Sequence, residues 1–340
     1  MNKKALRADI LLLLTAGIWG FGFVAQRSGM EYIGPFAFNG IRFILGSLSL
    51  LPLILIRRRR SVTGTAAPRY LLMPSMAAGG CLFIAVVFQQ FGIIFTTAGN
   101  AGFITGLYVV LTPLFGIFLG KKTGLVTWIG SILTLAGLYF ISAAGNEGSI
   151  NPGDILIVIS AFFWAAHVLL IDYLMRVKIT HNSGEDELPI DPVEISAGQF
   201  AVCGILSLVG AFLAEPYIGT AVERIDPSLL SAGLFQWQPF PALIASLNAG
   251  TARISAEALI PILYGGLCSV GIAYTLQVVA QRDAPPAHAT IILCFEGCFA
   301  ALGGMLLLSE KAGIWTLLGF AFMLAGMMAT QWDVIARRRR

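Results

Sequence analysis

The sequence predicts an all-α integral membrane protein with ten transmembrane helices in two inverted five-helix repeats. Its composition is apolar: 57% of the 340 residues are hydrophobic and only 12% are charged, whereas soluble domains carry about 25% charged residues. The apolar residues fall into runs of about 20, long enough to cross a ~30 Å hydrocarbon layer as helices. Marker side chains also recur in the same order in both halves, as in transporters built from internal repeats.

The apolar runs define ten candidate spans. Thr96, Thr97 and Ala98 alone separate the third span from the fourth. The first span follows basic residues, but its apolar run is too long for a cleaved signal peptide and nine more spans come after it. The ten spans are 8–26, 35–56, 70–95, 99–120, 124–143, 154–175, 193–214, 258–281, 286–308 and 314–332.

The spans divide the chain into two repeats, 1–145 and 151–333, joined by a segment rich in Gly and Pro, which break helices. The second repeat carries polar inserts at 176–192 and 215–257. We expect a solvated loop in the first insert, and short amphipathic helices at 228–233 and 240–250 in the second. A basic tail, 334–340, follows the last span.

The two repeats correspond residue by residue once polar insertions are allowed for. The offset between equivalent positions is 145 at the start of the repeat and 189 at its end, and it grows only across loops. Asp9 and Asp154 are expected to stabilise helix N-termini, and the glycines to permit close helix packing. The equivalent pairs are Asp9/Asp154, Trp19/Trp164, Arg42/Gln199, Gln89/Gln277, Asn100/His288, Tyr108/Glu296, Gly130/Gly319 and Gly137/Gly326.

Basic residues predict the orientation of the protein. With a cytoplasmic N-terminus, seventeen of the 22 Lys and Arg residues fall on the cytoplasmic side and four on the outer side. Because each half has five spans, the halves enter the membrane from opposite sides. We therefore expect a multi-pass protein of the inner (plasma) membrane with both termini in the cytoplasm. The arginine clusters at 57–60 and 337–340 are interpreted as anchors to anionic membrane lipids, not as nucleic-acid-binding patches.

Polar residues inside the spans are few, which makes Glu296 and Arg42 informative. Glu296 lies near the middle of the ninth span, where a carboxyl group could carry a proton or hold a substrate ammonium group. Alternatively, it could be a protonated carboxyl bonded to a neighbouring helix. Arg42 could extend to the membrane surface, bind a substrate carboxylate, or pair with Glu296.

Further residues could line a cavity between the repeats. His167 shares a helix face with Trp164, and its equivalent in the first repeat is Gly22. This asymmetry suits an asymmetric ligand, although a hydrogen-bonded packing histidine is the alternative. Capping is the alternative for Asn100, and an interface between the halves would also explain Trp19 and Trp164. The candidate substrate-binding residues are Trp19, Arg42, Gln89, Asn100, Tyr108, Trp164, His167, Tyr274, Gln277 and Glu296, with Glu296 also the candidate for proton coupling.

The sequence lacks a GxSxG, HExxH or P-loop motif and metal-ligand spacing. We therefore predict no enzyme activity, cofactor or metal. The five cysteines all lie within spans and are interpreted as small buried side chains. The expected partners are a small-molecule substrate and membrane lipids, not nucleic acid, and a homodimer is left open.

Several segments resemble the EamA-type members of the drug/metabolite transporter superfamily. The resemblance covers about residues 8–332 and includes the segments 96–110 with Pro113, 273–277, Phe295-Glu296 and 308–311. Two positions depart from the family pattern: Gly297 stands where proline often follows the glutamate, and Lys121 replaces the acidic residue that the second repeat keeps as Glu310.

The resemblance implies a carrier that exports small metabolites, amino acids or drugs across the inner (plasma) membrane. With the inverted repeats, it favours secondary active transport by alternating access from a cavity between the repeats. The alternative is a lipid-handling or lipid-flipping membrane protein without catalytic activity, which an open lateral groove would favour.

Overall fold

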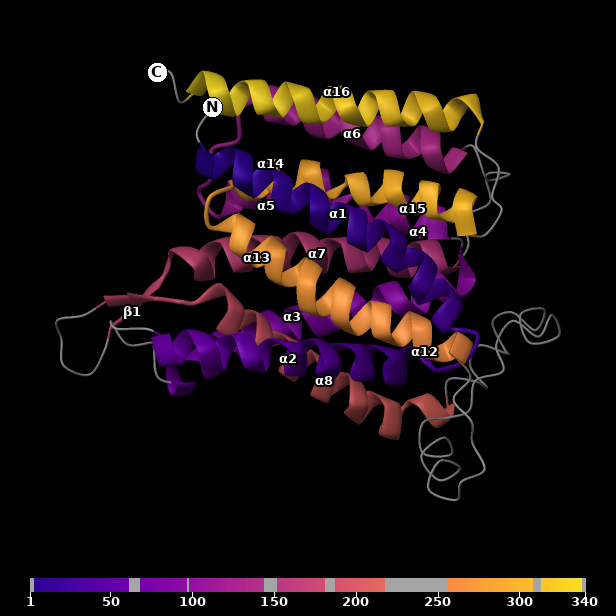
Figure 1. Cartoon of the computed structure of the whole chain (residues 1–340). Coiled ribbons are helices and arrows are strands. Elements are labelled where there is room, and N and C mark those ends of the chain that lie inside the picture. Colours follow the sequence, from indigo (N-terminus) through magenta and orange to yellow (C-terminus); the bar gives the residue numbers. More distant parts are fainter. Residues whose placement is uncertain are drawn as a thin grey trace.

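The computed structural model of the chain describes residues 3–60, 68–96, 98–143, 152–180, 187–217, 256–307 and 313–337. Helices lie side by side along one common direction, and the N- and C-terminal ends of the chain lie at the same end of the bundle (Figure 1). The helices of the first half are α1 (Lys3–Gly29), α2 (Pro35–Arg60), α3 (Pro68–Phe95), α4 (Ala98–Thr105), α5 (Tyr108–Phe118) and α6 (Leu125–Ala143).

The second half contains the corresponding helices and one short strand pair. Its elements are α7 (Pro152–Arg176), β1 (Lys178–Thr180), β2 (Glu187–Pro189), α8 (Pro192–Leu213), α12 (Ala256–Leu263), the π-helix η1 (Tyr264–Tyr274), α13 (Thr275–Gln281), α14 (Pro286–Leu293), α15 (Phe295–Leu307) and α16 (Ile314–Arg337). Five of the helices begin at a proline, a residue whose fixed φ suits the first helical position: α2, α3, α7, α8 and α14.

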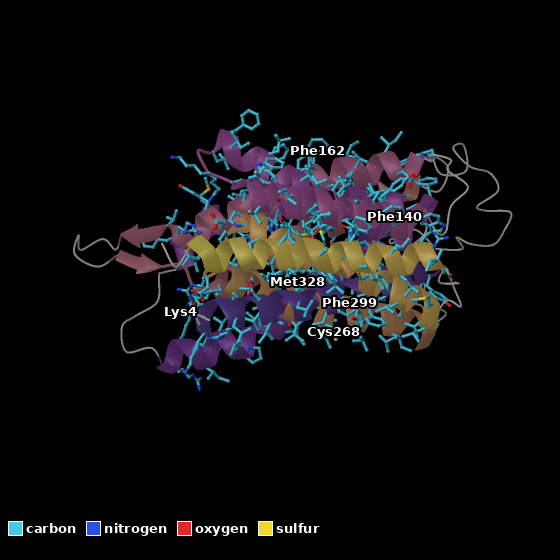
Figure 2. All side chains as sticks on the ribbon, turned by 90° about the horizontal axis from the view of Figure 1, so that it is seen from above. Lys4, Phe140, Phe162, Cys268, Phe299 and Met328 are labelled. Atoms are coloured by element: carbon cyan, nitrogen blue, oxygen red, sulfur yellow. The ribbon has the colours of Figure 1, made fainter. Side chains whose placement is uncertain are left out.

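Each predicted span coincides with helix in the structure. Eight segments are long and apolar enough to cross a membrane, and the shorter apolar helices Leu125–Phe140 and Leu317–Ala329 occupy the fifth and tenth positions. Large apolar side chains cover the outside of the bundle; Phe118 is 82% exposed and Met73 is 73% exposed. Figure 2 shows these side chains, with Met328 on α16 and Phe162 on one flank. The fold class predicted from the sequence is therefore confirmed.

The packing of helices follows the duplication. The last helices of the two repeats, α6 and α16, pack on each other at one side of the bundle, and α2 and α8 pack together at the opposite side (Figure 1). A Cβ atom at Gly137 would lie 2.6 Å from the Gly319 carbonyl oxygen, and one at Gly326 would lie 2.6 Å from that of Gly130. Because these glycines are repeat equivalents, the contact is reciprocal, and the expected close packing is confirmed.

The fourth and ninth spans are each interrupted at equivalent positions. α4 ends at Thr105 and α5 begins at Tyr108, while α14 ends at Leu293 and α15 begins at Phe295. At the first interruption, backbone hydrogen bonds join residues three apart instead of four. The Leu107 amide, for example, donates to the Ile104 carbonyl at 3.1 Å. A short stretch of such tighter bonds within a helix often marks a functional hinge. Each span was predicted as one continuous helix and still reads as one by length and composition; the tight turns within them were not predicted, because hydropathy does not register them.

Two other local expectations were wrong. The insert 176–192 contains a short antiparallel hairpin, in which Ile179 pairs with Leu188, rather than a loop alone; β-branched and apolar residues on both sides favour strand pairing. Asp9 does not lie at a helix N-terminus, because α1 begins six residues earlier, at Lys3. Asp154 does lie in the first turn of α7, as expected.

Two further expectations concern the insert 215–257 and the C-terminal tail. The amphipathic helices expected at 228–233 and 240–250 lie outside the described residues. The tail expected from residue 334 continues α16 as helix to Arg337.

Candidate functional site

A small cavity lies in the middle of the bundle. Its volume is about 30 Å³, measured as the space open to the centres of water molecules. The cavity therefore has room for only a few waters. Helices of both repeats contribute to its wall. The lining residues are Trp19, Phe23, Gln26, Arg42, Gln89, Thr105, Tyr108, Trp164, Val168, Ser269, Tyr274, Gln277, Leu293 and Glu296.

Equivalent residues of the two repeats touch each other across this cavity. The ring centroids of Trp19 and Trp164 are 6.3 Å apart, and the Tyr108 hydroxyl donates a hydrogen bond to Glu296 Oε1 at 3.1 Å. Residues related by a two-fold axis can meet only near that axis. The cavity therefore lies on the pseudo-two-fold axis between the inverted repeats, where carriers of this architecture hold their substrates.

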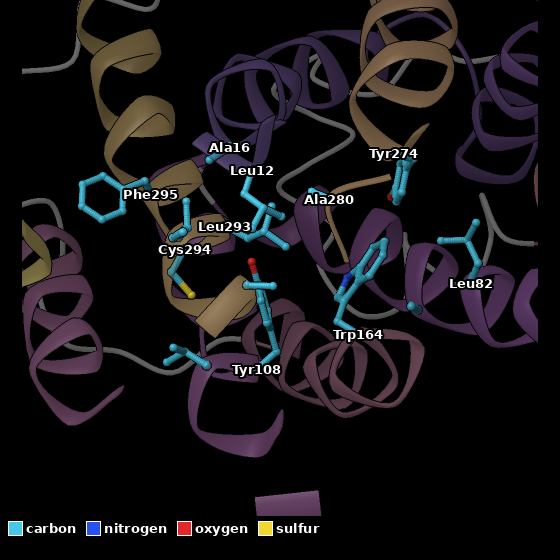
Figure 3. Close-up of a cluster of buried hydrophobic side chains, with 14 of the residues drawn as sticks. Leu12, Ala16, Leu82, Tyr108, Trp164, Tyr274, Ala280, Leu293, Cys294 and Phe295 are labelled. Atoms are coloured by element: carbon cyan, nitrogen blue, oxygen red, sulfur yellow. The ribbon is translucent and has the colours of Figure 1, made fainter. Parts of the chain in front are cut away.

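Aromatic rings form one wall of the cavity. Tyr274 lies 4.5 Å from Trp19 and 5.9 Å from Trp164 between ring centroids. Figure 3 shows Tyr108, Trp164 and Tyr274 reaching this region from three different elements. Trp164 Nε1 donates to Gln89 Oε1 at 2.6 Å, and Trp19 Nε1 donates to the Ser269 carbonyl at 3.3 Å. These bonds fix the orientation of both indole rings.

The π-helix brings Ser269 and Tyr274 to the cavity. Its carbonyls at Ser269 and Ala273 accept hydrogen bonds from Trp19 and from Thr15, the latter at 3.1 Å. Extended π-helices are rare, and single wide turns occur often at functional sites. Here the carbonyl groups of the wide turns in the eighth span accept hydrogen bonds from the side chains of Thr15 and Trp19 on α1.

Glu296 is buried at the second helix interruption. Its side chain is 3% exposed, and it is reached from α5 by the Tyr108 hydroxyl. Gly20 allows α1 to approach closely, since a Cβ there would lie 2.7 Å from the Glu296 carbonyl oxygen. The carboxyl group is thus held between helices of both repeats.

Arg42 is a buried cation on the cavity wall. It is 2% exposed, and its Nε donates to Asn39 Oδ1 at 3.0 Å. The guanidinium carbon lies 5.0 Å from the Phe43 ring centroid and 5.4 Å from that of Phe38. Within the described residues no carboxylate oxygen lies within 4.0 Å of it, so Arg42 and Glu296 line the same cavity without forming an ion pair.

Two predicted site residues are not placed on the cavity wall. His167 lies beside Trp164, with its Nε2 2.9 Å from Gln199 Oε1 and its ring edge-on to the indole. Asn100 belongs to α4, but its side chain is outside the described part of the structure. Its repeat equivalent His288 contacts Asp9 Oδ1 at 2.8 Å. The other eight candidates all line the cavity.

Three polar lining residues were missed by the sequence analysis: Gln26, Thr105 and Ser269. Gln26 follows Trp19 by seven residues, which places both on one helix face, so a signal for it was present. Gln26 Oε1, Thr105 Oγ1 and Gln277 Oε1 are buried without a hydrogen-bond partner among the described residues. A polar ligand entering the cavity could satisfy these atoms.

Comparison with known proteins identifies the family. A profile of the EamA-like transporter family matches residues 6–143 and, a second time, residues 151–331. The chain belongs to the EamA-like transporter family. As a member, it is a multi-pass membrane transporter, and the family resemblance seen in the sequence is confirmed.

Relatives across bacteria and archaea support the same assignment. An uncharacterized transporter of Archaeoglobus fulgidus is 34% identical over 313 residues, which cover 90% of this EamA-like chain and 80% of the relative. The uncharacterized inner membrane transporter YedA of Escherichia coli K12 is 28% identical over 70% of this chain and 81% of YedA. The structure also aligns with a solved crystal structure over 98% of each chain, with a TM-score of 0.69 and 16% sequence identity. This similarity supports the fold alone.

Proposed function

We propose that this EamA-like protein is a secondary active transporter that exports a small metabolite, with the central cavity as its substrate site. The observation that carries the proposal is the position of the cavity on the pseudo-two-fold axis between inverted repeats. Rocking of one repeat against the other exposes such a site alternately to the two sides. Export is the direction that the sequence resemblance implies.

The small size of the cavity supports an occluded state. Ligand pockets usually enclose about 300–1,000 Å³, whereas this one leaves about 30 Å³ for the centres of water-sized molecules. Binding of a metabolite then requires the helices to separate. The interruptions at 106–107 and 294 lie beside lining residues of both repeats, and helix interruptions of this kind are where such movement is accommodated.

Arg42 favours a substrate that carries a carboxylate. A cation buried without a counter-charge is costly in a membrane interior. A carboxylate that enters the cavity would supply the missing counter-charge with bidentate geometry. Trp19, Trp164 and Tyr274 would then contact the apolar part of the molecule.

Glu296 would couple transport to protons. It is a buried carboxyl group beside the proposed substrate site, and it can exchange a proton when the cavity opens to water. The Tyr108 hydroxyl donates to it and would support the ionised form during that step.

Counterflow into proteoliposomes tests the substrate class. A panel of labelled carboxylates is compared with the matching primary amides, in wild type, Arg42→Lys and Arg42→Gln. We expect wild type to prefer acids over amides by about 10-fold or more, the scale of one buried charge-assisted contact. Arg42→Lys should keep part of this preference and Arg42→Gln should lose it. An unchanged preference in Arg42→Gln would rule out the proposed role of Arg42.

The lipid-handling alternative makes a different prediction. A lateral groove between α5 and α7 does exist, but its lining residues and those of the central cavity do not overlap among the described residues. Lipid flipping through the groove would move labelled phospholipid between leaflets in vesicles. Counterflow of a water-soluble acid without such lipid movement favours the metabolite carrier.

A further inference from the structure

A second site lies on the outside of the bundle, away from the cavity. A groove of about 750 Å³ runs between α5 and α7. Its wall is formed mainly by apolar side chains, among them Phe115, Phe118, Leu119 and Leu170. Phe118 is 82% exposed and Leu119 is 64% exposed. In a membrane protein these side chains face lipid, so the groove is open to acyl chains.

One part of the groove is charged. Asp172 is completely buried, and its two carboxylate oxygens are shared between Lys121 and Arg176. Arg176 donates to Oδ1 from Nη2 at 2.8 Å and from Nε at 3.1 Å. Both cations also line the groove itself. The carboxylate therefore positions two positive groups beside an apolar surface.

A third cation adds an excess of positive charge. A hollow of about 250 Å³ adjoins the groove and is lined by Lys121, Lys122 and Arg176 together with Gly116 and Pro286. Lys122 is exposed and forms no ion pair with another described residue. Lys121 and Arg176 contact the Asp172 carboxylate and Lys122 lines the adjoining hollow, so the cations outnumber the carboxylate where α5 ends.

The excess of positive charge is not shared by the equivalent position of the other repeat. The repeat equivalent of Lys121, at offset 189, is Glu310. The second repeat therefore carries the opposite charge at the same position. A lysine at this position in one repeat and a glutamate in the other suit a ligand that binds one flank of the molecule, rather than one held on the pseudo-two-fold axis.

We propose that the groove between α5 and α7 binds an anionic phospholipid. Its phosphate group would contact Lys121, Lys122 and Arg176, and one acyl chain would lie along Phe115, Leu119 and Leu170. Basic pockets between transmembrane helices on the cytoplasmic side bind anionic headgroups in this way. The juxtaposition of an acyl-sized apolar groove with excess positive charge is what selects a phospholipid over a soluble anion or a neutral lipid.

Thermal unfolding of the full chain in detergent tests the proposal. The unfolding midpoint is measured on addition of phosphatidylglycerol and of phosphatidylcholine with identical acyl chains. Native mass spectrometry counts the lipids that remain bound. We expect phosphatidylglycerol to raise the midpoint more and to remain bound preferentially. Glycerol phosphate, which has the headgroup chemistry without acyl chains, should not reproduce the shift.

Two variants and one control locate the site. Lys122→Gln removes an exposed cation without touching the Asp172 ion pairs, and should weaken apparent phosphatidylglycerol affinity about fivefold, the effect of one cation at an anionic surface. Ala166→Phe, in the groove wall, should weaken retention of the lipid by filling the space for its chain. Arg282→Gln, an exposed cation outside the arginine clusters at 57–60 and 337–340, should behave as wild type.

Three results would overturn the proposal. One is an equal shift of the midpoint with the two lipids. Another is an unchanged phosphatidylglycerol preference in Lys122→Gln. The third is full reproduction of the shift by glycerol phosphate, which would identify a soluble phosphate site instead.

Discussion

Tyr108 and Glu296 occupy equivalent positions in the two repeats, yet they carry different chemistry and bond to each other across the axis. An interaction on a two-fold axis between unlike residues makes the site itself asymmetric. Arg42 adds to this asymmetry, because its equivalent Gln199 bonds to His167 instead of lining the cavity. These few residues distinguish the substrate site from the symmetric scaffold around it.

The Glu296→Gln variant tests proton coupling at this position. Glutamine retains an acceptor for the Tyr108 hydroxyl but cannot carry a proton, so the cavity should keep its shape while coupling is lost. We expect uptake into proteoliposomes to become independent of an imposed pH gradient. Tyr108→Phe is the complementary control, because it removes the hydrogen bond that Glu296→Gln keeps and leaves the carboxyl group, and it should still respond to the gradient. Equal pH-gradient dependence in wild type and Glu296→Gln would exclude this role.

The Asp172 cluster makes a prediction about stability. Lys121→Gln leaves the buried Asp172 carboxylate with Arg176 as its remaining partner in the cluster, and should destabilise the protein by about 1–3 kcal/mol, below the cost of fully unpairing a buried ion pair. Adding Asp172→Asn removes the buried carboxylate that has lost one of its two partners, and should recover part of the loss. The four thermal unfolding curves of this double-mutant cycle measure the coupling. Strictly additive effects would show that the pair is not energetically linked.

The residues of the site were largely predictable by comparing the two copies. Trp19, Trp164, Tyr108 and Glu296 were all expected at the cavity because they occur at equivalent depths. His167 was the exception, because helix periodicity could not show that its ring packs edge-on to Trp164 and bonds to Gln199 instead of lining the cavity. The partner of Asp9 was also hidden, because His288 is 279 residues away in the chain.

Interrupted helices and glycine contacts determine how the elements can move and pack. The interruptions place Thr105, Tyr108, Leu293 and Glu296 at the cavity, while the last helices of the repeats, α6 and α16, meet through glycines. Ten apolar runs sufficed to predict the helices. They could not predict the tight turns or the π-helix, because these change backbone hydrogen bonding without changing hydropathy.

Replacement of Gly137 tests the contact between α6 and α16. A Cβ atom there would lie 2.6 Å from the Gly319 carbonyl and 2.9 Å from the Met323 amide nitrogen, so the two helices would have to separate. Gly137→Ala should destabilise the protein by about 1–3 kcal/mol, as overpacking usually does. Gly80→Ala is the control, because no heavy atom lies within 4 Å of a Cβ at Gly80. A Gly137→Ala variant as stable as the control would contradict the close contact.

At the scale of the whole molecule, basic residues gather at one end of the bundle. Lys4, Arg7, Arg57 and Arg282 line a single hollow of about 520 Å³ there, and the chain termini lie at the same end (Figure 1). We predict that this end is cytoplasmic. Reporter fusions at the N- and C-termini should both show cytoplasmic activity and lack periplasmic activity. A periplasmic signal from either terminus would contradict the orientation.

The central claim is that the cavity between the inverted repeats is the substrate site of a carrier. Counterflow of the best carboxylate from the screen tests it most directly, in wild type, Ser269→Phe and Ala166→Phe. Ser269 lies on the cavity wall and Ala166 lies in the lateral groove, so the two variants fill different spaces with the same ring. Thermal unfolding confirms that each variant is folded. The account predicts that Ser269→Phe loses transport while Ala166→Phe retains it; wild-type transport by a folded Ser269→Phe variant would contradict the account.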